Sequence, residues 1–233
     1  GSYLEKGFNA VKIRGGYSNI ERDLETVKSI RDSLGYNFDL MLDVGQNYVP
    51  HNWSIKETVN VCNRLSEYRL FFIEEPYVTD DIGGYSEVKK LSKIPIAMGE
   101  NGSTIYEFEQ FIDSDVADIY QPDATNVGGI SQFLKVSEYA NLYKKKIAPH
   151  IFRSGVSLMA HLHLLVSIPN SLIFEYCMIP NPLMFDILNV NPKLEEGYIY
   201  PNEEPGLGVY IDDKILKKYK FLDKVQYFKV EKE

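Results

Sequence analysis

Three acidic side chains follow successive apolar runs of the sequence. Asp43 ends LMLD, Glu74 ends FFIE and Glu100 follows IPIAMG. They recur at roughly the length of one βα unit, about 30 residues, and the carboxyl ends of barrel strands meet at one mouth. Three converging carboxylates repel one another unless a cation lies among them. Oxygen ligands without a Cys or His at the adjoining strand ends suit Mg²⁺ better than zinc. The sequence therefore predicts one Mg²⁺ held by Asp43, Glu74 and Glu100.

Two later strand ends supply a carboxylate and an imidazole. Asp123 lies in QPD, and His150 follows the apolar run IAP. A buried carboxylate that touches an imidazole fixes its tautomer and raises its pKa, which makes the imidazole a competent proton acceptor. We therefore predict that Asp123 and His150 form an acid/base pair. His161 and His163 lie inside an apolar helical stretch, where packing is the expected role.

Two cations precede these groups on the first apolar run, AVKIR. Lys12 and Arg14 are two residues apart, so they share a face of a strand. Both would project into the mouth opposite His150, where they could bind a carboxylate substrate and stabilise an enolate. The alternative is that they are solvated strand-end charges. A lysine there could act as a base if its pKa were depressed, whereas an arginine stays protonated. Glu175 ends the last apolar run, SLIFE.

Short apolar runs alternate with amphipathic stretches along the chain, which predicts βαβ units and a parallel sheet. The start signals Ser54 with Glu57, and Ser103 or Thr104 before Ile105, support two of the helices. The expected strands are Ala10–Ile13, Leu40–Val44, Leu70–Ile73, Ile94–Met98, Ala117–Gln121, Lys146–Pro149 and Ser171–Tyr176. The expected helices are Ile20–Leu34, Ser54–Tyr68, Gly84–Ser92, Ile105–Asp113, Ile130–Leu142 and Ser157–Ser167.

A barrel explains the ionisable strand ends better than an open sheet does. A doubly wound sheet would scatter them along an edge and would be expected to carry a glycine fingerprint, which is not found. We expect a TIM-like barrel over residues 1–180. A closed barrel of this kind has eight strands, so we expect its first strand to lie outside this chain. Residues 181–233 form a second segment, and its Pro/Gly-rich part, Asn181–Gly208, suits a long stretch that follows the surface.

Composition restricts the partners and the compartment. The 233 residues suit one large domain, and the net charge of −8 disfavours nucleic acid and anionic membranes. No run approaches the roughly 20 apolar residues of a membrane span, and no signal peptide opens the sequence. Cys62 and Cys177 do not suggest a disulfide framework, which favours a reducing cytoplasm.

These residues and their contexts resemble the enolase superfamily, specifically its mandelate racemase subgroup (the mandelate racemase/muconate lactonizing enzyme family). The resemblance covers nearly the whole chain through GFNAVKIRGG, LMLDVGQNY, FFIEEP, IPIAMGEN, DIYQPDATNVGGIS, IAPHIF, FEY and NPL…PGLGV. It implies a (β/α)7β barrel, abstraction of a proton α to a carboxylate, and Mg²⁺ on Asp43, Glu74 and Glu100. It also implies that Asp123–His150 is the acid/base dyad. Lys12 would then be the first lysine of a Lys-x-Lys motif, and Glu175 would hydrogen-bond an enediolate oxygen.

Two positions depart from the family pattern. Arg14 replaces the second lysine, which removes the usual base on the face opposite His150, and Gly45 stands where relatives often carry Asn. One-base chemistry remains available, because His150 can take the α-proton and then assist loss of the β-hydroxyl. The resemblance therefore favours dehydration of a sugar acid to a 2-keto-3-deoxy acid. The alternatives are a racemase, epimerase or cycloisomerase of the same subgroup, or a catalytically silent domain.

The resemblance also implies partners. The family has an N-terminal α+β capping domain that closes over the barrel mouth and selects the substrate, and this domain is absent from the chain. Asn181–Val209 would normally pack against it, so the chain would expose surface that needs a partner. A small carboxylate substrate and a homo-oligomeric state are expected from the family.

Overall fold

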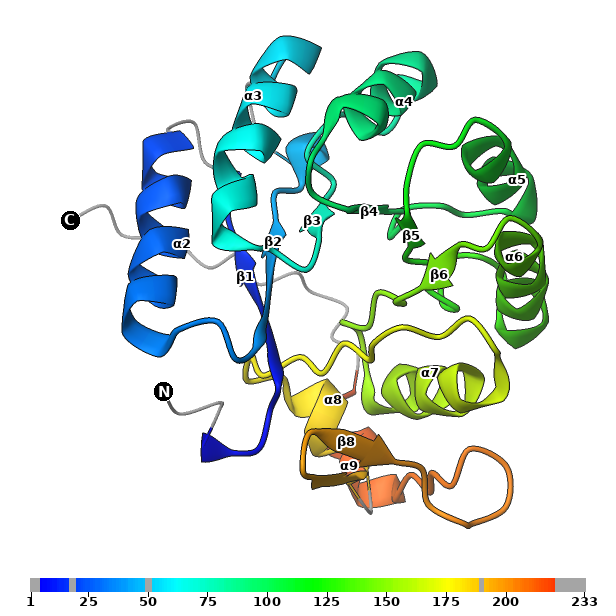
Figure 1. Cartoon of the computed structure of the whole chain (residues 1–233). Helices are drawn as coiled ribbons and strands as arrows, with labels where there is room; N and C mark the ends of the chain where they lie inside the picture. The colour runs from blue at the N-terminus through cyan, green and yellow to red at the C-terminus, as the bar shows by residue number, and fades with distance from the viewer. Residues whose placement is uncertain (1–4, 17–19, 49–51, 189–190, 221–233) are drawn as a thin grey trace.

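The computed structural model describes residues 5–16, 20–48, 52–188 and 191–220 (Figure 1). Six parallel strands form one sheet in sequence order, each paired with the next along the chain. They are β1 (Ala10–Arg14), β2 (Asp39–Asp43), β3 (Ile73–Glu74), β4 (Ile96–Met98), β5 (Ile119–Tyr120) and β6 (Lys146–Ile147). The prediction of a seventh strand over Ser171–Tyr176 was too long. This segment contributes a single parallel bridge, between Ser171 and Ile147.

Helices follow the strands and cover the outer side of the curved sheet (Figure 1). The predicted helices Ile20–Leu34, Ile105–Asp113 and Ile130–Leu142 match at both ends. The expected helix Ser54–Tyr68 divides into the α-helix Ile55–Leu65 (α3) and the 3-10 helix Ser66–Tyr68 (η2). Arg69 ends η2 with a φ of 50°, a left-handed conformation that stops the helix. The helical elements of the barrel are α2 (Ile20–Leu34), η1 (Gln46–Tyr48), α3 (Ile55–Leu65), η2 (Ser66–Tyr68), α4 (Ile82–Leu91), α5 (Ile105–Asp113), α6 (Ile130–Leu142) and α7 (Gly155–Ser167).

Two of these helices begin with the predicted capping boxes. The Ser54 side chain accepts a hydrogen bond from the Glu57 backbone N–H, and the Glu57 carboxylate accepts one from the Ser54 N–H at 2.8 Å. Thr104 and Glu107 make the same reciprocal pair at the start of α5. Each box satisfies two backbone donors that a helix start otherwise leaves unpaired.

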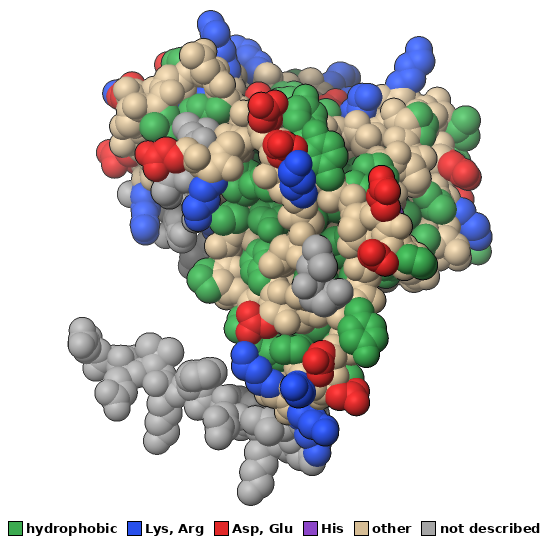
Figure 2. Space-filling view, turned by 90° about the horizontal axis from the view of Figure 1, so that it is seen from below, with side chains coloured by type: hydrophobic (Ala, Val, Ile, Leu, Met, Phe, Trp, Pro, Cys, Tyr) green, Lys and Arg blue, Asp and Glu red, His purple; other side chains and the backbone are tan. Residues whose placement is uncertain are grey.

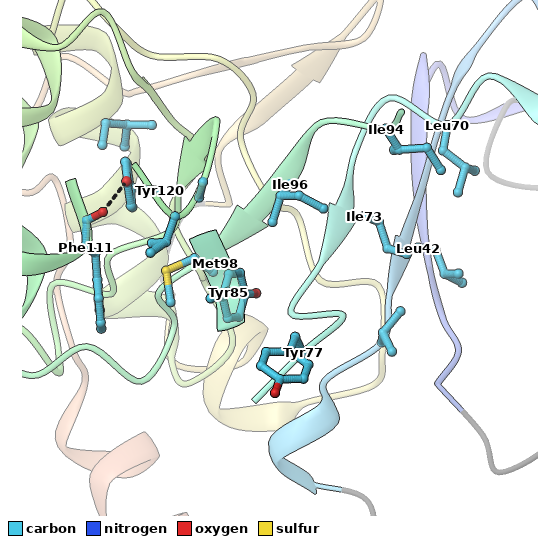
Figure 3. Packing of buried hydrophobic residues seen from close by; sticks show 14 of the residues in the cluster. Leu42, Leu70, Ile73, Tyr77, Tyr85, Ile94, Ile96, Met98, Phe111 and Tyr120 are labelled. Carbon is cyan, nitrogen blue, oxygen red and sulfur yellow. Dashed lines mark hydrogen bonds between the residues drawn. The ribbon is translucent and has the colours of Figure 1, made fainter. Parts of the chain in front are cut away.

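The sheet separates two apolar cores. The larger one lies between the sheet and the helices, and includes Leu42, Ile73, Ile96 and Tyr120, with the Tyr120 hydroxyl donating to the Phe111 carbonyl (Figure 3). The smaller one lies inside the curve of the sheet, and we call it the inner core. It consists of Met41, Phe72, Ala97, Ile119 and Ala148, with Ala10, Phe71, Leu172 and Ile173 packed against it. A sheet that curves around its own packed side chains is a barrel wall, as predicted.

A third cluster joins the C-terminal segment to the barrel. Met184 and Leu188 pack with Leu158, Met159 and Leu162 of α7. The segment forms α8 (Pro182–Phe185), an antiparallel hairpin of β7 (Lys193–Glu195) and β8 (Tyr198–Tyr200), and α9 (Asp213–Lys218). The Pro/Gly-rich composition did not predict this hairpin. Glu196 and Gly197 have φ values of 50° and 81°, which is the two-residue turn that suits a twisted hairpin.

The surface seen from below carries basic and acidic side chains among hydrophobic ones (Figure 2). In the described part of the chain no helix is long and apolar enough to cross a membrane. Cys62 is buried and Cys177 is half-buried, and both are free thiols.

The α3 capping box gives a test of the fold. Ser54→Ala should lower the free energy of unfolding by about 1 kcal/mol, because it removes the acceptor for the Glu57 N–H. Urea denaturation monitored by circular dichroism measures the change. Ser131→Ala, at an exposed position in the first turn of α6, is the matched control and should change stability by much less. Equal effects of the two substitutions would contradict the capping role.

Candidate active site at the barrel mouth

The inner face of the sheet changes from apolar to ionisable toward the carboxyl ends of the strands. On β1, Lys12 follows Ala10 by two residues, and on β2, Asp43 follows Met41 in the same way. Because side chains alternate across a strand, residues two apart point to the same side. The same step relates Phe72 to Glu74, Ala148 to His150 and Ile173 to Glu175, so the inner core lies directly beneath a ring of charged groups.

Lys12 is the most enclosed cation of this ring. Its Nζ lies 2.6 Å from Oε2 of Glu74 and 2.7 Å from Oε1 of Glu175. Burial works against the ammonium, but the carboxylates of Glu74, Glu175 and Asp43 outweigh it and raise the pKa of Lys12. The surroundings of Lys12 therefore favour the ammonium over the neutral amine that a lysine base would need.

The three predicted metal ligands each face a different donor. Lys12 contacts Glu74, Arg14 Nη1 lies 2.6 Å from Oδ1 of Asp43, and the Tyr48 hydroxyl donates to Oε1 of Glu100 at 2.8 Å. Within residues 5–16, 20–48, 52–188 and 191–220, no three acidic, imidazole or thiol groups already lie close enough together to hold a metal ion. Each of the three carboxylates is thus paired with a donor of its own.

The donor chemistry nevertheless fits a hard divalent cation. Oε1 of Glu74 is buried and makes no hydrogen bond of ordinary geometry among the described residues, although the Gln121 side chain is near enough to help lower the pKa of Glu74. This oxygen could therefore turn to a ligand. Burial, with the charge of Glu74, raises the pKa of Asp43 to about 6, and burial, with the charge of Glu100, raises the pKa of Glu75 to about 8. Such excess buried negative charge is what a bound cation would relieve.

His150 and Asp123 form the predicted pair. His150 Nδ1 lies 3.0 Å from Oδ2 of Asp123, and its Nε2 lies 3.7 Å from Oε2 of Glu100, so Nε2 faces the acidic ring. Asp123 has no exposed surface, and its Oδ1 accepts from the N–H and hydroxyl of Thr125. Burial works against the imidazolium, but Asp123, Glu175 and Glu100 outweigh it and raise the pKa of His150.

Glu175 connects the two halves of the ring. Its Oε2 accepts from the Ile151 N–H at 2.9 Å, next to His150, while its Oε1 contacts Lys12. The eight predicted site residues therefore lie at the mouth in three contacting groups: Lys12 with Glu74 and Glu175, Arg14 with Asp43, and His150 with Asp123 and Glu100.

Three mouth residues were not predicted. Tyr48 donates to Glu100, Asn126 Nδ2 donates to the Glu100 carbonyl at 2.9 Å, and Arg153 Nη2 donates to Oδ1 of Asn126 at 2.7 Å. Arg153 Nε also lies 3.8 Å from Oδ2 of Asp123. Tyr48 ends η1, and Asn126 and Arg153 lie in loops. Each comes soon after a strand, which was the available signal, although polar residues follow other elements of the sequence as well.

The two departures from the family pattern are physically coupled. Gly45 has a φ of 53°, and a Cβ at this position would lie 2.4 Å from Nη2 and 2.7 Å from Nη1 of Arg14. The guanidinium thus occupies the space that a side chain at position 45 would need. With a larger residue at position 45, the Arg14 guanidinium would have to leave this pose.

The barrel with an acidic ring and a His–Asp pair at its mouth defines a class of enzyme domain. A family model described as enolase C-terminal domain-like matches residues 2–215. The chain belongs to this family, and its relatives and structural neighbours are members of the mandelate racemase/enolase superfamily.

Three similar proteins indicate the range of the family. The L-talarate/galactarate dehydratase of Salmonella typhimurium is 31% identical over 210 residues, covering 90% of this chain and 49% of that enzyme. The structure of a putative mandelate racemase from Bordetella bronchiseptica has a TM-score of 0.89 at 28% identity, covering 97% of this chain and 60% of that one. The L-talarate dehydratase of Polaromonas sp., solved with Mg and L-glucarate, has a TM-score of 0.82 at 25% identity, covering 93% and 56%. The chain thus spans about half of the curated relative's length.

The contact between Gly45 and Arg14 gives a second test. Gly45→Ala should lower the free energy of unfolding by more than the roughly 1–2 kcal/mol that a left-handed backbone costs a side chain, because the new Cβ meets the guanidinium. Gly35→Ala is the matched control, since Gly35 has a φ of 74° and open space around its Cβ position. In an Arg14→Ala background the excess cost at Gly45 should disappear. A persistent excess in the double variant, measured by urea denaturation, would contradict the coupling.

Proposed function

We propose that this barrel belongs to a Mg²⁺-dependent enzyme that abstracts the proton α to a carboxylate and dehydrates a sugar acid to a 2-keto-3-deoxy acid. The observation that carries the proposal is the asymmetry of the mouth. An imidazole with a carboxylate behind it stands on one side, and an arginine paired with Asp43 stands on the other. Among the described residues, His150 is the imidazole that faces this ring, and elimination requires one such general base.

Asp43, Glu74 and Glu100 would hold the metal. When bound, Mg²⁺ would supply Lewis-acid neutralisation of the substrate carboxylate and of the charge that develops on it. Oε1 of Glu74 and the all-oxygen donor set support this assignment. The relative solved with Mg and L-glucarate supports the choice of metal.

The protein groups would divide the proton chemistry between them. Nε2 of His150 takes the α-proton while Asp123 holds Nδ1–H and stabilises the imidazolium. The Lys12 ammonium faces the negative charge left on the carboxylate, and Glu175 would hydrogen-bond an enediolate oxygen if its carboxyl group carries the proton to donate. The imidazolium then returns its proton to the β-hydroxyl, the C–O bond breaks and water leaves. The resulting enol tautomerises to the 2-keto-3-deoxy acid.

A racemase or epimerase of the same subgroup is the second candidate. The structural likeness to a putative mandelate racemase favours it. It requires proton transfer on both faces of the α-carbon, and Arg14 is a poor base because its guanidinium stays protonated. A cycloisomerase remains a third form of the same first step.

The C-terminal segment, residues 181–233, would contact a capping domain. Tyr198 and Tyr210 are 67% and 72% exposed, and Ile179 just before the segment is 61% exposed. Large apolar side chains exposed in this way suit a protein partner better than water. Residues 189–190 and 221–233 of this segment lie outside the described part of the chain.

Metal binding can be tested without a substrate. Mg²⁺ at about 100 times its dissociation constant should raise the free energy of unfolding by about 2.7 kcal/mol, seen as a rise in melting temperature. Glu74→Gln should abolish this rise, because it removes the buried anionic ligand. Glu138→Gln, on the exposed face of α6, should retain it. A Mg²⁺-dependent rise that survives in Glu74→Gln would contradict the proposed metal site.

The reaction itself can be tested with a library of aldonates and aldarates. The full-length protein with Mg²⁺ should release a 2-keto-3-deoxy acid from at least one of them, detected with semicarbazide. His150→Asn should abolish the product, whereas His163→Gln, on the neighbouring helix, should retain it. The absence of turnover with any sugar acid would overturn the dehydratase proposal. Solvent deuterium at C2 of unconverted substrate in both configurations would instead identify a racemase or epimerase.

A further inference from the structure

His161 is a fully buried histidine that the proposed reaction does not use. It lies on α7, with no exposed surface, and its ring meets Phe133 edge-on at a centroid distance of 5.7 Å. Both ring nitrogens have backbone partners. Nδ1 lies 2.8 Å from the Ser157 carbonyl oxygen, and Nε2 lies 2.8 Å from the Ala124 backbone nitrogen. Hydrogen bonds at both ring nitrogens fix the orientation of the imidazole, which packing among apolar side chains alone does not require.

These two bonds determine the protonation state of His161. A carbonyl oxygen only accepts, so Nδ1 carries the proton, and a backbone N–H only donates, so Nε2 offers its lone pair. The neutral Nδ1–H tautomer satisfies both partners, whereas an imidazolium would lose the bond to Ala124. Burial lowers the pKa of His161, which agrees with the neutral form.

The partner of Nε2 is the residue that follows Asp123. The turn begins at Asp123, whose carbonyl accepts from the N–H groups of Asn126 and Val127, both at 2.9 Å. Thr125 satisfies Oδ1 of Asp123 through its N–H and hydroxyl, at 2.8 and 2.6 Å. His161 Nε2 lies 3.6 Å from the same oxygen, but both atoms are acceptors. His161 therefore fixes the backbone of the turn rather than the carboxylate.

We propose that His161 is a positioning residue of the His150–Asp123 dyad. By accepting the Ala124 N–H, it holds the turn in the orientation that leaves Oδ2 of Asp123 directed at His150 Nδ1, 3.0 Å away. Without this acceptor the Ala124 N–H would be buried and unpaired, and the turn would shift to find another partner. Only the kinetic consequence of this role rests on the proposed function, because the hydrogen bond between His150 and Asp123 exists without substrate.

The hydrogen-bonded Nδ1 proton of His150 is a direct spectroscopic probe of this role. It should appear as a downfield proton resonance in the metal-free protein, assigned by its loss in His150→Asn. His161→Leu, which fills the space but offers no acceptor, should broaden or remove the resonance. His161→Gln should keep it, because its amide oxygen reaches about as far along the side chain as Nε2 does. A wild-type resonance in His161→Leu would overturn the proposal.

A second apolar variant and a control on the same helix separate positioning from packing. His161→Met adapts to irregular spaces and should behave as His161→Leu does, so a folding failure of one still leaves a test. His163→Leu, two residues along α7, should leave the His150 resonance unchanged. Equal loss of the resonance in the His161 and His163 variants would overturn the proposal in favour of general helix packing.

Kinetics add a readout once a substrate is found. His161→Leu should lower kcat by about 10²-fold, the cost of a small misplacement of a reacting group, with KM nearly unchanged, and His161→Gln should recover most of the loss. A rise in KM with kcat unchanged would overturn the positioning role. Absence of turnover in the wild-type enzyme would overturn the proposed dehydration, and the resonance of His150 would still test His161.

Discussion

The half-buried Lys12 lies between two carboxylates, 2.6 Å from Glu74 and 2.7 Å from Glu175, and the geometry of the mouth depends on this arrangement. Charges removed from water are costly unless opposite charges and hydrogen bonds surround them. Glu74 lies on β3, whereas Glu175 lies beyond the single bridge that attaches Ser171 to β6. The ammonium therefore connects β1 to the segment that contains Glu175. Among the described residues, no strand pairing joins β1 to that segment. Electrostatic compensation at the site also holds the two ends of the sheet together.

The alternation of side chains along each strand converts this requirement into a layered architecture. Met41 and Phe72 fill the inner core, and Asp43 and Glu74, two residues further on, stand above it. An apolar layer beneath the ring excludes water from one side, which strengthens every charge interaction above it. The same layer contributes to the burial that raises the pKa of Asp43 to about 6. Lys12 and Arg14 contact these acids and compensate their charge. Packing and site chemistry follow from one periodic pattern.

This pattern is the part that the sequence carries most directly. Ionisable residues that follow apolar runs predicted the barrel mouth, and capping residues such as Ser54 and Thr104 predicted helix starts. The β7–β8 hairpin was missed because composition suggested a loop, while the Glu196–Gly197 turn was a more local signal. His161 was assigned to packing because a histidine in an apolar helix looks the same whether or not its ring accepts a hydrogen bond. Contacts between distant segments, such as Ala124 with His161, have no counterpart in local periodicity.

The coupling of Arg14 to Gly45 bears on which chemistry the mouth can support. The guanidinium lies against Asp43, in space that a Cβ at position 45 would occupy, and it keeps its positive charge. The surrounding carboxylates raise the pKa of Arg14 against the effect of burial, so Arg14 offers a cation on this side of the mouth and is not itself a proton acceptor. On the other side, Asp123 supports an imidazole that can gain and lose a proton. A site with one such group can remove a proton and return it to a leaving hydroxyl on the same face, and this asymmetry connects the two unusual residues to elimination rather than to racemisation.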